Sequence, residues 1–234
     1  MRRLRLQGLS IGVRHGDEIV DSHSVVVPEL QTLRYLKELF VSESIISRFP
    51  SLPPSLEVLR MESYSSSLSR GNTLSPNFWE SFERSPLPML RDLHLPVIHQ
   101  IWNPDPSPQR IKRLLQYSHG KLESFRLSTG ALINDAFMMQ LVDEGFLCNL
   151  VHLTLESQDG KTTGDDLVEK IAGSCPHLQS FNASGGCLTG VGVKALVSQV
   201  KGLKRLNFSD CSRVSPDAVT WARSMGILID TVRV

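Results

Sequence analysis

The chain has 234 residues, a formal net charge of +1 and 41% hydrophobic residues. These values are ordinary for a folded chain and exclude the collagen-like and wholly disordered classes. No apolar run approaches the ~20 residues that a membrane-spanning helix needs, and a charge near zero gives no overall attraction to nucleic acid or to anionic lipid. We therefore expect neither nucleic acid nor a membrane among the partners.

The chain begins with several arginines before its first acidic residue, Asp17. An arginine-rich, acid-poor start is typical of a mitochondrial presequence. The interpretation that we favour is that residues 1–6 already form a strand, because their pattern recurs along the chain. We expect a cytoplasmic or nuclear protein, with mitochondria as the minor alternative.

The chain contains 33 leucines, and many fall in one hexapeptide pattern: apolar, two variable, apolar, one variable, apolar. The pattern occupies residues 1–6, 36–41, 56–61, 90–95, 122–127, 150–155, 178–183, 203–208 and 229–234. Its alternation predicts strands that bury one side, and such strands must stack on neighbouring repeats to be stable. Nine copies, of which the last five are almost evenly spaced, indicate a repeat protein.

Helices are expected between these strands, because parallel strands need a crossover of a dozen or more residues. Helix starts are predicted at four places by a capping residue ahead of an apolar stripe: Asn134, Thr163, Thr189 and Ser215. Ser107-Pro108 is expected to start a further, basic helix. The predicted fold is an α/β, open right-handed leucine-rich-repeat solenoid similar to ribonuclease inhibitor, with a curved parallel sheet on the concave face and helices on the convex face.

The first half of the chain is less regular than the second. We expect a long loop over the Ser-rich residues 63–75, a short helix anchored by Phe78, Trp79 and Phe82, and a rigid proline-rich loop over 103–108. Residues 49–54 leave no room for a full helix. We interpret these segments as insertions in one domain, 1–234, of about nine repeats, irregular over 1–121 and regular over 122–234.

The four cysteines, Cys148, Cys175, Cys187 and Cys211, all lie in the second half and form no CxxC pair. We expect them to be reduced and mostly buried. A metal site built from Cys175, His177 and the other cysteines is the weaker alternative. No cofactor and no metal is predicted.

Residues 175–225 resemble the cysteine-containing leucine-rich repeats of F-box proteins, especially fungal ones. The resemblance is carried by Cys175-Pro-His-Leu178, by the run from Cys187 to Leu196, by the run from Gly202 to Cys211 and by Val214-Ser-Pro-Asp-Ala218. It implies that Cys187 and Cys211 pack beneath the turns that follow consecutive strands. The F-box itself, which docks the adaptor of a cullin-type ubiquitin ligase, has no counterpart in this sequence. An adaptor partner is therefore expected only if an F-box lies outside this chain.

The candidate binding residues are the variable side chains that point away from the core. They are Arg5, Phe40, Arg60, His94, Arg126, His152, Asn182 and Asn207. Solenoids bind extended partners on this surface, and arginine and exposed aromatics are frequent hot-spot residues. The predicted partner is a protein, with an acidic or phosphorylated segment as the favoured ligand. The alternative is that these charges solvate the strands and pair with one another.

Catalytic motifs are weak in this sequence. Gly160-Lys161-Thr162 lacks the upstream glycine of a phosphate-binding loop, and Asp165-Asp166 stands at a predicted helix start, where acids complement the helix dipole. We expect no enzyme and no catalytic residue. The leading hypothesis is a protein-interaction module, the substrate-recognition region of an F-box-type ubiquitin-ligase receptor. The alternative is a free-standing repeat scaffold or inhibitor without a ligase link.

Overall fold

The computed structural model describes residues 2–7, 30–42, 51–62, 86–95, 108–118, 120–130 and 133–230. The chain divides into two compact units, Met1–Ser118 and His119–Val234. The loop predicted over 63–75, the helix expected around Phe78 and the proline-rich loop over 103–107 lie outside the described residues.

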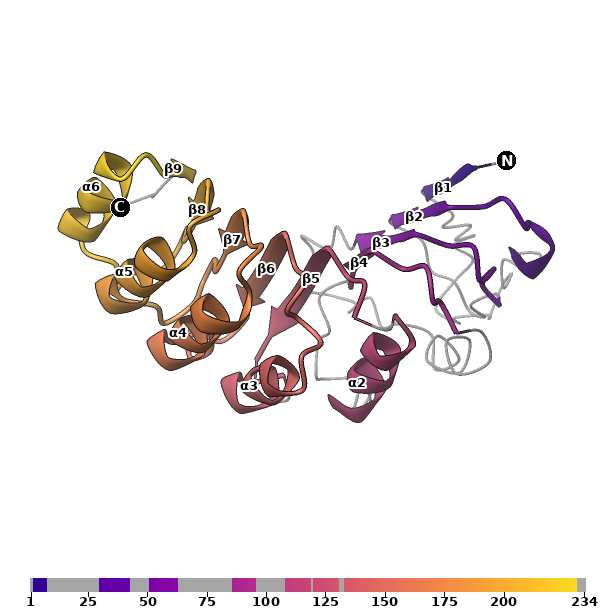
Figure 1. Ribbon diagram of the computed structural model, residues 1–234, viewed down its shortest axis with the longest axis horizontal. Helices are drawn as coiled ribbons and strands as arrows, with labels where there is room; N and C mark the ends of the chain where they lie inside the picture. The colour runs from indigo at the N-terminus through magenta and orange to yellow at the C-terminus, as the bar shows by residue number, and fades with distance from the viewer. Residues whose placement is uncertain are drawn as a thin grey trace, which may run out of the picture. The chain divides into compact units, whose positions relative to one another are not determined.

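The first unit contains a parallel sheet whose strands follow one another in chain order (Figure 1). Its strands are β1 (Arg3–Gln7), β2 (Glu38–Ser42), β3 (Val58–Glu62) and β4 (Asp92–His94). A short 3₁₀ turn, η1 (Leu30–Thr32), lies ahead of β2. The basic helix α2 (Pro108–Tyr117) starts at the predicted proline and buries Ile111, Leu114 and Leu115.

The core of the first unit is built from the apolar positions of the hexapeptide. Leu39, Leu59 and Leu93 are partners in register on adjacent strands, and each is fully buried. Between β2 and β3, the described residues 51–57 form turns rather than a helix. Proline accounts for this, because Pro53 and Pro54 cannot donate the backbone hydrogen bonds of a helix.

The second unit repeats a strand–helix step with greater regularity. Its strands are β5 (Ser124–Thr129), β6 (His152–Ser157), β7 (Ser180–Asn182), β8 (Arg205–Asn207) and β9 (Leu228–Asp230), again parallel and in chain order. The intervening helices are α3 (Asp135–Asp143), α4 (Asp165–Ser174), α5 (Gly190–Gln199) and α6 (Pro216–Ser224). Figure 1 shows these helices in one row on one side of the strands of this unit.

Three of the four predicted helix caps are confirmed. The side chains of Asn134, Thr189 and Ser215 accept hydrogen bonds from backbone N–H groups in the first turns of their helices. The prediction that Thr163 caps α4 is wrong, because the cap residue is Gly164, which has no side chain to do so. Thr163 instead takes a left-handed backbone conformation, with φ of 61°, one residue earlier.

A carboxylate at the start of α3 and another at the start of α4 join neighbouring repeats. Asp135 accepts hydrogen bonds from the backbone N–H groups of Thr163 (2.6 Å) and Gly164 (2.8 Å), ahead of the next helix. Asp165 accepts from Thr189 N (2.9 Å), Thr189 Oγ1 (2.6 Å) and Gly192 N (3.0 Å) at the start of α5. We call these two separate contacts, one made by Asp135 and one by Asp165, the Asp135–Asp165 clasps. Each satisfies N–H groups that the next repeat would otherwise leave unpaired.

The register of the last repeat differs from the sequence-based prediction. The hexapeptide assigned to 229–234 made Ile229 the first apolar position, but Ile229 is the register partner of Leu206, which is the second. The helix before it ends at Ser224, and Gly226 turns the chain with φ of +82° directly into β9. The strand therefore starts three residues earlier than the leucine pattern indicated.

Stacked parallel strands, with buried leucines on one side and helices in the connections of the second unit, confirm an α/β repeat solenoid. The division into one domain of about nine repeats stays a prediction. Among the described residues, no helix is long and apolar enough to cross a membrane.

Candidate functional site

The side of the strands away from the buried leucines presents polar residues in rows. In the first unit, one row consists of Arg5, Phe40, Arg60 and His94, which are register partners on β1 to β4. We call it the Arg5 row. Its neighbouring row consists of Arg3, Glu38, Val58 and Asp92. The structure thus brings together the four site residues predicted in this half of the chain.

Phe40 is the centre of the Arg5 row. The guanidinium carbons of Arg3, Arg5 and Arg60 lie 5.5, 5.4 and 5.8 Å from the centroid of its ring. The face of an aromatic ring attracts cations at such distances. One half-buried phenyl ring therefore orients three positive charges, two from β1 and one from β3.

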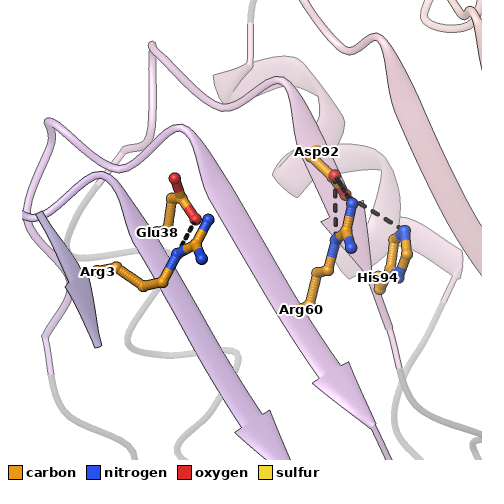
Figure 2. Close-up of polar contacts among 5 residues, drawn as sticks. All are labelled: Arg3, Glu38, Arg60, Asp92 and His94. Carbon is orange, nitrogen blue, oxygen red and sulfur yellow. Dashed lines mark hydrogen bonds and ion pairs between the residues drawn. The ribbon is translucent and has the colours of Figure 1, made fainter. Parts of the chain in front are cut away.

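Two of these three arginines are paired with carboxylates of the next strand (Figure 2). Arg3 Nε donates to Glu38 at 2.5 Å, and Arg60 donates to Asp92 Oδ2 through Nη2 at 2.5 Å and Nε at 3.1 Å. The other oxygen of Asp92 lies 3.3 Å from Nε2 of His94. The alternative interpretation, that charges pair across the strands, is thereby confirmed for Arg3 and Arg60.

Arg5 differs from its two neighbours. Its side chain is exposed, and its contact within the part of the chain that the structure describes is with the Phe40 ring rather than with a carboxylate. The group of arginines around Phe40 therefore combines one oriented, accessible guanidinium, that of Arg5, with two that are paired with carboxylates, those of Arg3 and Arg60.

The corresponding row of the second unit begins with Arg126 on β5 and continues through Thr154, Asn182, Asn207 and Asp230. Arg126 donates from Nη2 to Glu156 of the next strand at 2.6 Å, so this arginine is also paired. The predicted residue His152 lies in the neighbouring row, exposed, with Ser124 and Ser180 as its register partners.

The two predicted asparagines of this row stabilise their own turns. Asn182 Oδ1 accepts from Ser184 N at 3.0 Å, and Asn207 Oδ1 accepts from Ser209 N at 2.9 Å. A side chain that closes a turn on its own backbone two residues ahead is a local structural device. The carboxamide oxygens of Asn182 and Asn207 are therefore already used within the chain.

The polar side chains at the ends of β5 and β6 form a cluster that sequence reasoning missed. The hydroxyl oxygens of Thr129 and Thr162 lie 2.7 Å apart, and Thr162 donates to Ser157 at 2.9 Å. Ser157 in turn accepts from Gly160 N at 3.2 Å. The Gly160-Lys161-Thr162 motif therefore closes a turn between strand and helix. The hint in the sequence was that the members of this cluster are all small hydroxyl residues.

The cysteines are free thiols in the structure. Cys175 and Cys211 are buried, and their Sγ atoms donate to the carbonyls of Leu147 (3.2 Å) and Ala183 (2.8 Å). Burial raises the pKa of Cys175 to about 12 and also raises the pKa of Cys211. Cys187 Sγ donates to the carbonyl of Lys161 (3.3 Å) in the preceding repeat, as Cys211 does to Ala183, but Cys187 is only half-buried, so the expected packing beneath its turn is less complete. Among the described residues, no group of three or more His, Cys, Asp or Glu could hold a metal ion.

Comparison with known proteins gives two informative similarities. No protein-family model matches the chain. A 60-residue stretch is 40% identical to the F-box/TPR repeat protein pof3 of Schizosaccharomyces pombe, covering 25% of this chain and 10% of that protein. The solved structure titled "Crystal structure of Rad7 and Elc1 complex in yeast" matches with a TM-score of 0.58 and 15% identity, over 86% of this chain and 50% of the matched chain.

These two similarities support different conclusions. The structural one shows the fold alone, because the sequences are only 15% identical. The sequence similarity is to a repeat protein whose name includes an F-box, and the chain spans only a tenth of it. Together they indicate a repeat region of the kind found in F-box-type proteins.

Proposed function

We propose that this chain is a protein-interaction module that binds its partner on the exposed faces of its strands. The observation that carries the proposal is the in-register display of polar side chains from parallel strands whose opposite sides are filled with buried leucine and phenylalanine. The charged or polar residues at these positions do not contribute to the core. Repeat proteins of this build use such a face for extended partners.

The more specific part of the proposal is that the module is the substrate-recognition region of an F-box-type ubiquitin-ligase receptor. Support comes from the resemblance of residues 175–225 to cysteine-containing F-box repeats and from the 40% identity to a protein named F-box/TPR repeat protein. In this role the chain binds a target protein, and an F-box outside the 234 residues binds the ligase adaptor.

Site-specific photo-cross-linking tests the binding face. A benzophenone amino acid is placed at His152, exposed on β6, and in a matched variant at Glu169, exposed on α4 of the same unit. We expect a defined cross-linked protein from the His152 variant in native extract and none from the Glu169 variant. The same cross-linked protein from both positions, or from Glu169 alone, would contradict binding through the strands.

Co-purification tests the ligase role separately. The product of the complete transcript is expected to bring down a ubiquitin-ligase adaptor and to cross-link its target through position 152. Cross-linking of the target without any adaptor would support the alternative, a free-standing scaffold.

A further inference from the structure

Around the Phe40 ring, the side chains that the structure describes include three guanidiniums and two carboxylates. Glu38 and Asp92 pair with Arg3 and Arg60. The third guanidinium, that of Arg5, lies on the edge of this group and is exposed. Among these described side chains, Arg5 is therefore the guanidinium that a further anion can neutralise.

The geometry holds the Arg5 guanidinium ready for that anion. Its carbon lies 5.4 Å from the ring centroid of Phe40, so the ring limits the orientations that the long side chain can adopt. Ordering a flexible side chain normally subtracts from binding, and an arginine already ordered by a ring loses less. The planar group can still present two parallel N–H bonds to a carboxylate.

We propose, on the basis of the protein-interaction function above, that Arg5 held against Phe40 binds a carboxylate side chain of an acidic protein segment lying along β1 to β3. A carboxylate fits better than a phosphate, because among the described side chains one guanidinium of the three, that of Arg5, has no carboxylate partner, and one singly charged group neutralises it. A doubly charged phosphate would leave negative charge beside Glu38. The residues of the Arg5 row lie on successive strands, about 4.8 Å apart. A segment that follows this row across the strands must therefore be extended.

Fluorescence anisotropy of the full chain tests this inference with a defined probe. The probe is a fluorescein-labelled octapeptide of alternating glutamate and serine, in which the carboxylates project from one side of an extended chain. Two companion peptides replace glutamate by glutamine, or keep glutamine and phosphorylate the serines. We expect the wild-type chain to bind the glutamate peptide, and to bind the glutamine peptide and the phosphorylated peptide more weakly.

Matched variants locate the binding. Arg5→Gln should weaken binding of the glutamate peptide by about five- to tenfold, as loss of a charge-assisted hydrogen bond at an exposed site implies. Arg34→Gln changes the net charge equally, but Arg34 is an exposed residue of the turn before β2, and its effect should stay below about twofold. Phe40→Leu keeps apolar bulk and removes the ring, and should weaken binding by about threefold.

Several outcomes would overturn the inference. No binding of the glutamate peptide, preference for the phosphorylated peptide, or equal losses from Arg5→Gln and Arg34→Gln would each do so. Circular dichroism of every variant separates these results from unfolding. Such a failure would leave the cross-linking at position 152 intact, whereas failure of the proposed function would abolish that cross-link as well.

Discussion

Neighbouring repeats are joined by different side chains in the two units. In the first unit, adjacent strands are joined on their exposed face by ion pairs such as Arg60–Asp92, and the described connection between β2 and β3 has no helix. In the second unit, each described connection contains a helix, capped by a side chain in α3, α5 and α6, and the Asp135–Asp165 clasps join one repeat to the next. The first unit therefore concentrates charge on its strand face, and the second concentrates it at its helix starts.

This difference indicates which parts of the repeat are free to serve binding. The second unit obtains much of its inter-repeat order from part-buried hydrogen bonds beside the helices. Its strand face carries one ion pair, Arg126–Glu156, between β5 and β6, and small polar groups such as Asn182 and Asn207 farther along. The first unit places arginine and phenylalanine on the strand face itself. A partner that recognises charge is expected at the first unit.

The largest expected effect is on the shared core. Leu206 is 1% exposed and is the register partner of Phe181 and Ile229. Leu206→Ala should lower the free energy of unfolding by about 2–5 kcal/mol, through lost burial and the cavity left behind. Urea denaturation measures the change. An unchanged midpoint would mean that the repeat register is wrong.

The next effect concerns the clasps. Asp165→Ala removes the acceptor of three hydrogen bonds from Thr189 and Gly192, and should cost about 2–3 kcal/mol of unfolding free energy. The control is Asp166→Ala, since Asp166 is exposed in the same helical turn and should cost less than about 1 kcal/mol. Equal losses of unfolding free energy from the two substitutions would mean that both carboxylates act only through the helix dipole.

A pH-dependent effect follows from the buried thiol of the second unit. Burial raises the pKa of Cys175 from 9.0 to about 12, so the folded state favours the neutral thiol. Its stabilisation is fully present below pH 9 and is lost as pH rises toward 12. At pH 10.5 the loss should be about 2 kcal/mol, and Cys175→Ala should remove this component of the pH dependence. An identical alkaline slope in both proteins would contradict the assignment.

Thiol labelling sharpens the same comparison within the second unit. Cys175 and Cys211 should react slowly at pH 8, because both are buried and their pKa values are raised. Cys187 is half-buried and should react before them, although its pKa is raised as well. Mass spectrometry of partly labelled protein gives the order. Cys175 or Cys211 labelled as fast as in denaturant would show that these turns open readily.

The smallest expected effects are those of single ion pairs. Asp92→Asn should cost about 1–2 kcal/mol, more than an exposed pair, because Asp92 is only 13% exposed and accepts two hydrogen bonds from Arg60. Asp143→Asn in the second unit should cost almost nothing, since Asp143 is 62% exposed in its pair with Lys170. A larger loss at Asp143 than at Asp92 would reverse the proposed contrast between the units.

The strands and the helix starts were largely predictable from the sequence, since periodicity and capping act over a few residues. The leucine pattern located β1 to β8, and side-chain chemistry located the caps at Asn134, Thr189 and Ser215. The failure at Thr163 has a tertiary cause. Asp135 of the preceding repeat accepts hydrogen bonds from the N–H groups of Thr163 and Gly164, and Thr163 takes a left-handed conformation there, so the helix is capped one residue later, at Gly164.

The last register and the site electrostatics were less predictable. The predicted hexapeptide aligned Val232 with Leu206, but Ile229 takes that position, because α6 ends at Ser224 and a turn leads from it to β9. The rows of the strand face followed from the sequence, but their ion pairs did not. Arg60 bonds to Asp92, diagonally across from it, while its direct register partner is His94.

Hydrogen–deuterium exchange of the full chain with the glutamate–serine octapeptide tests binding on the strand face of the first unit, because it surveys both units in one measurement. We expect slower exchange in the peptic fragments that contain residues 2–7 and 36–42, with no change over the helices α3 to α6. Slowing confined to the helices, or spread equally over both units, would contradict binding on the strand face of the first unit.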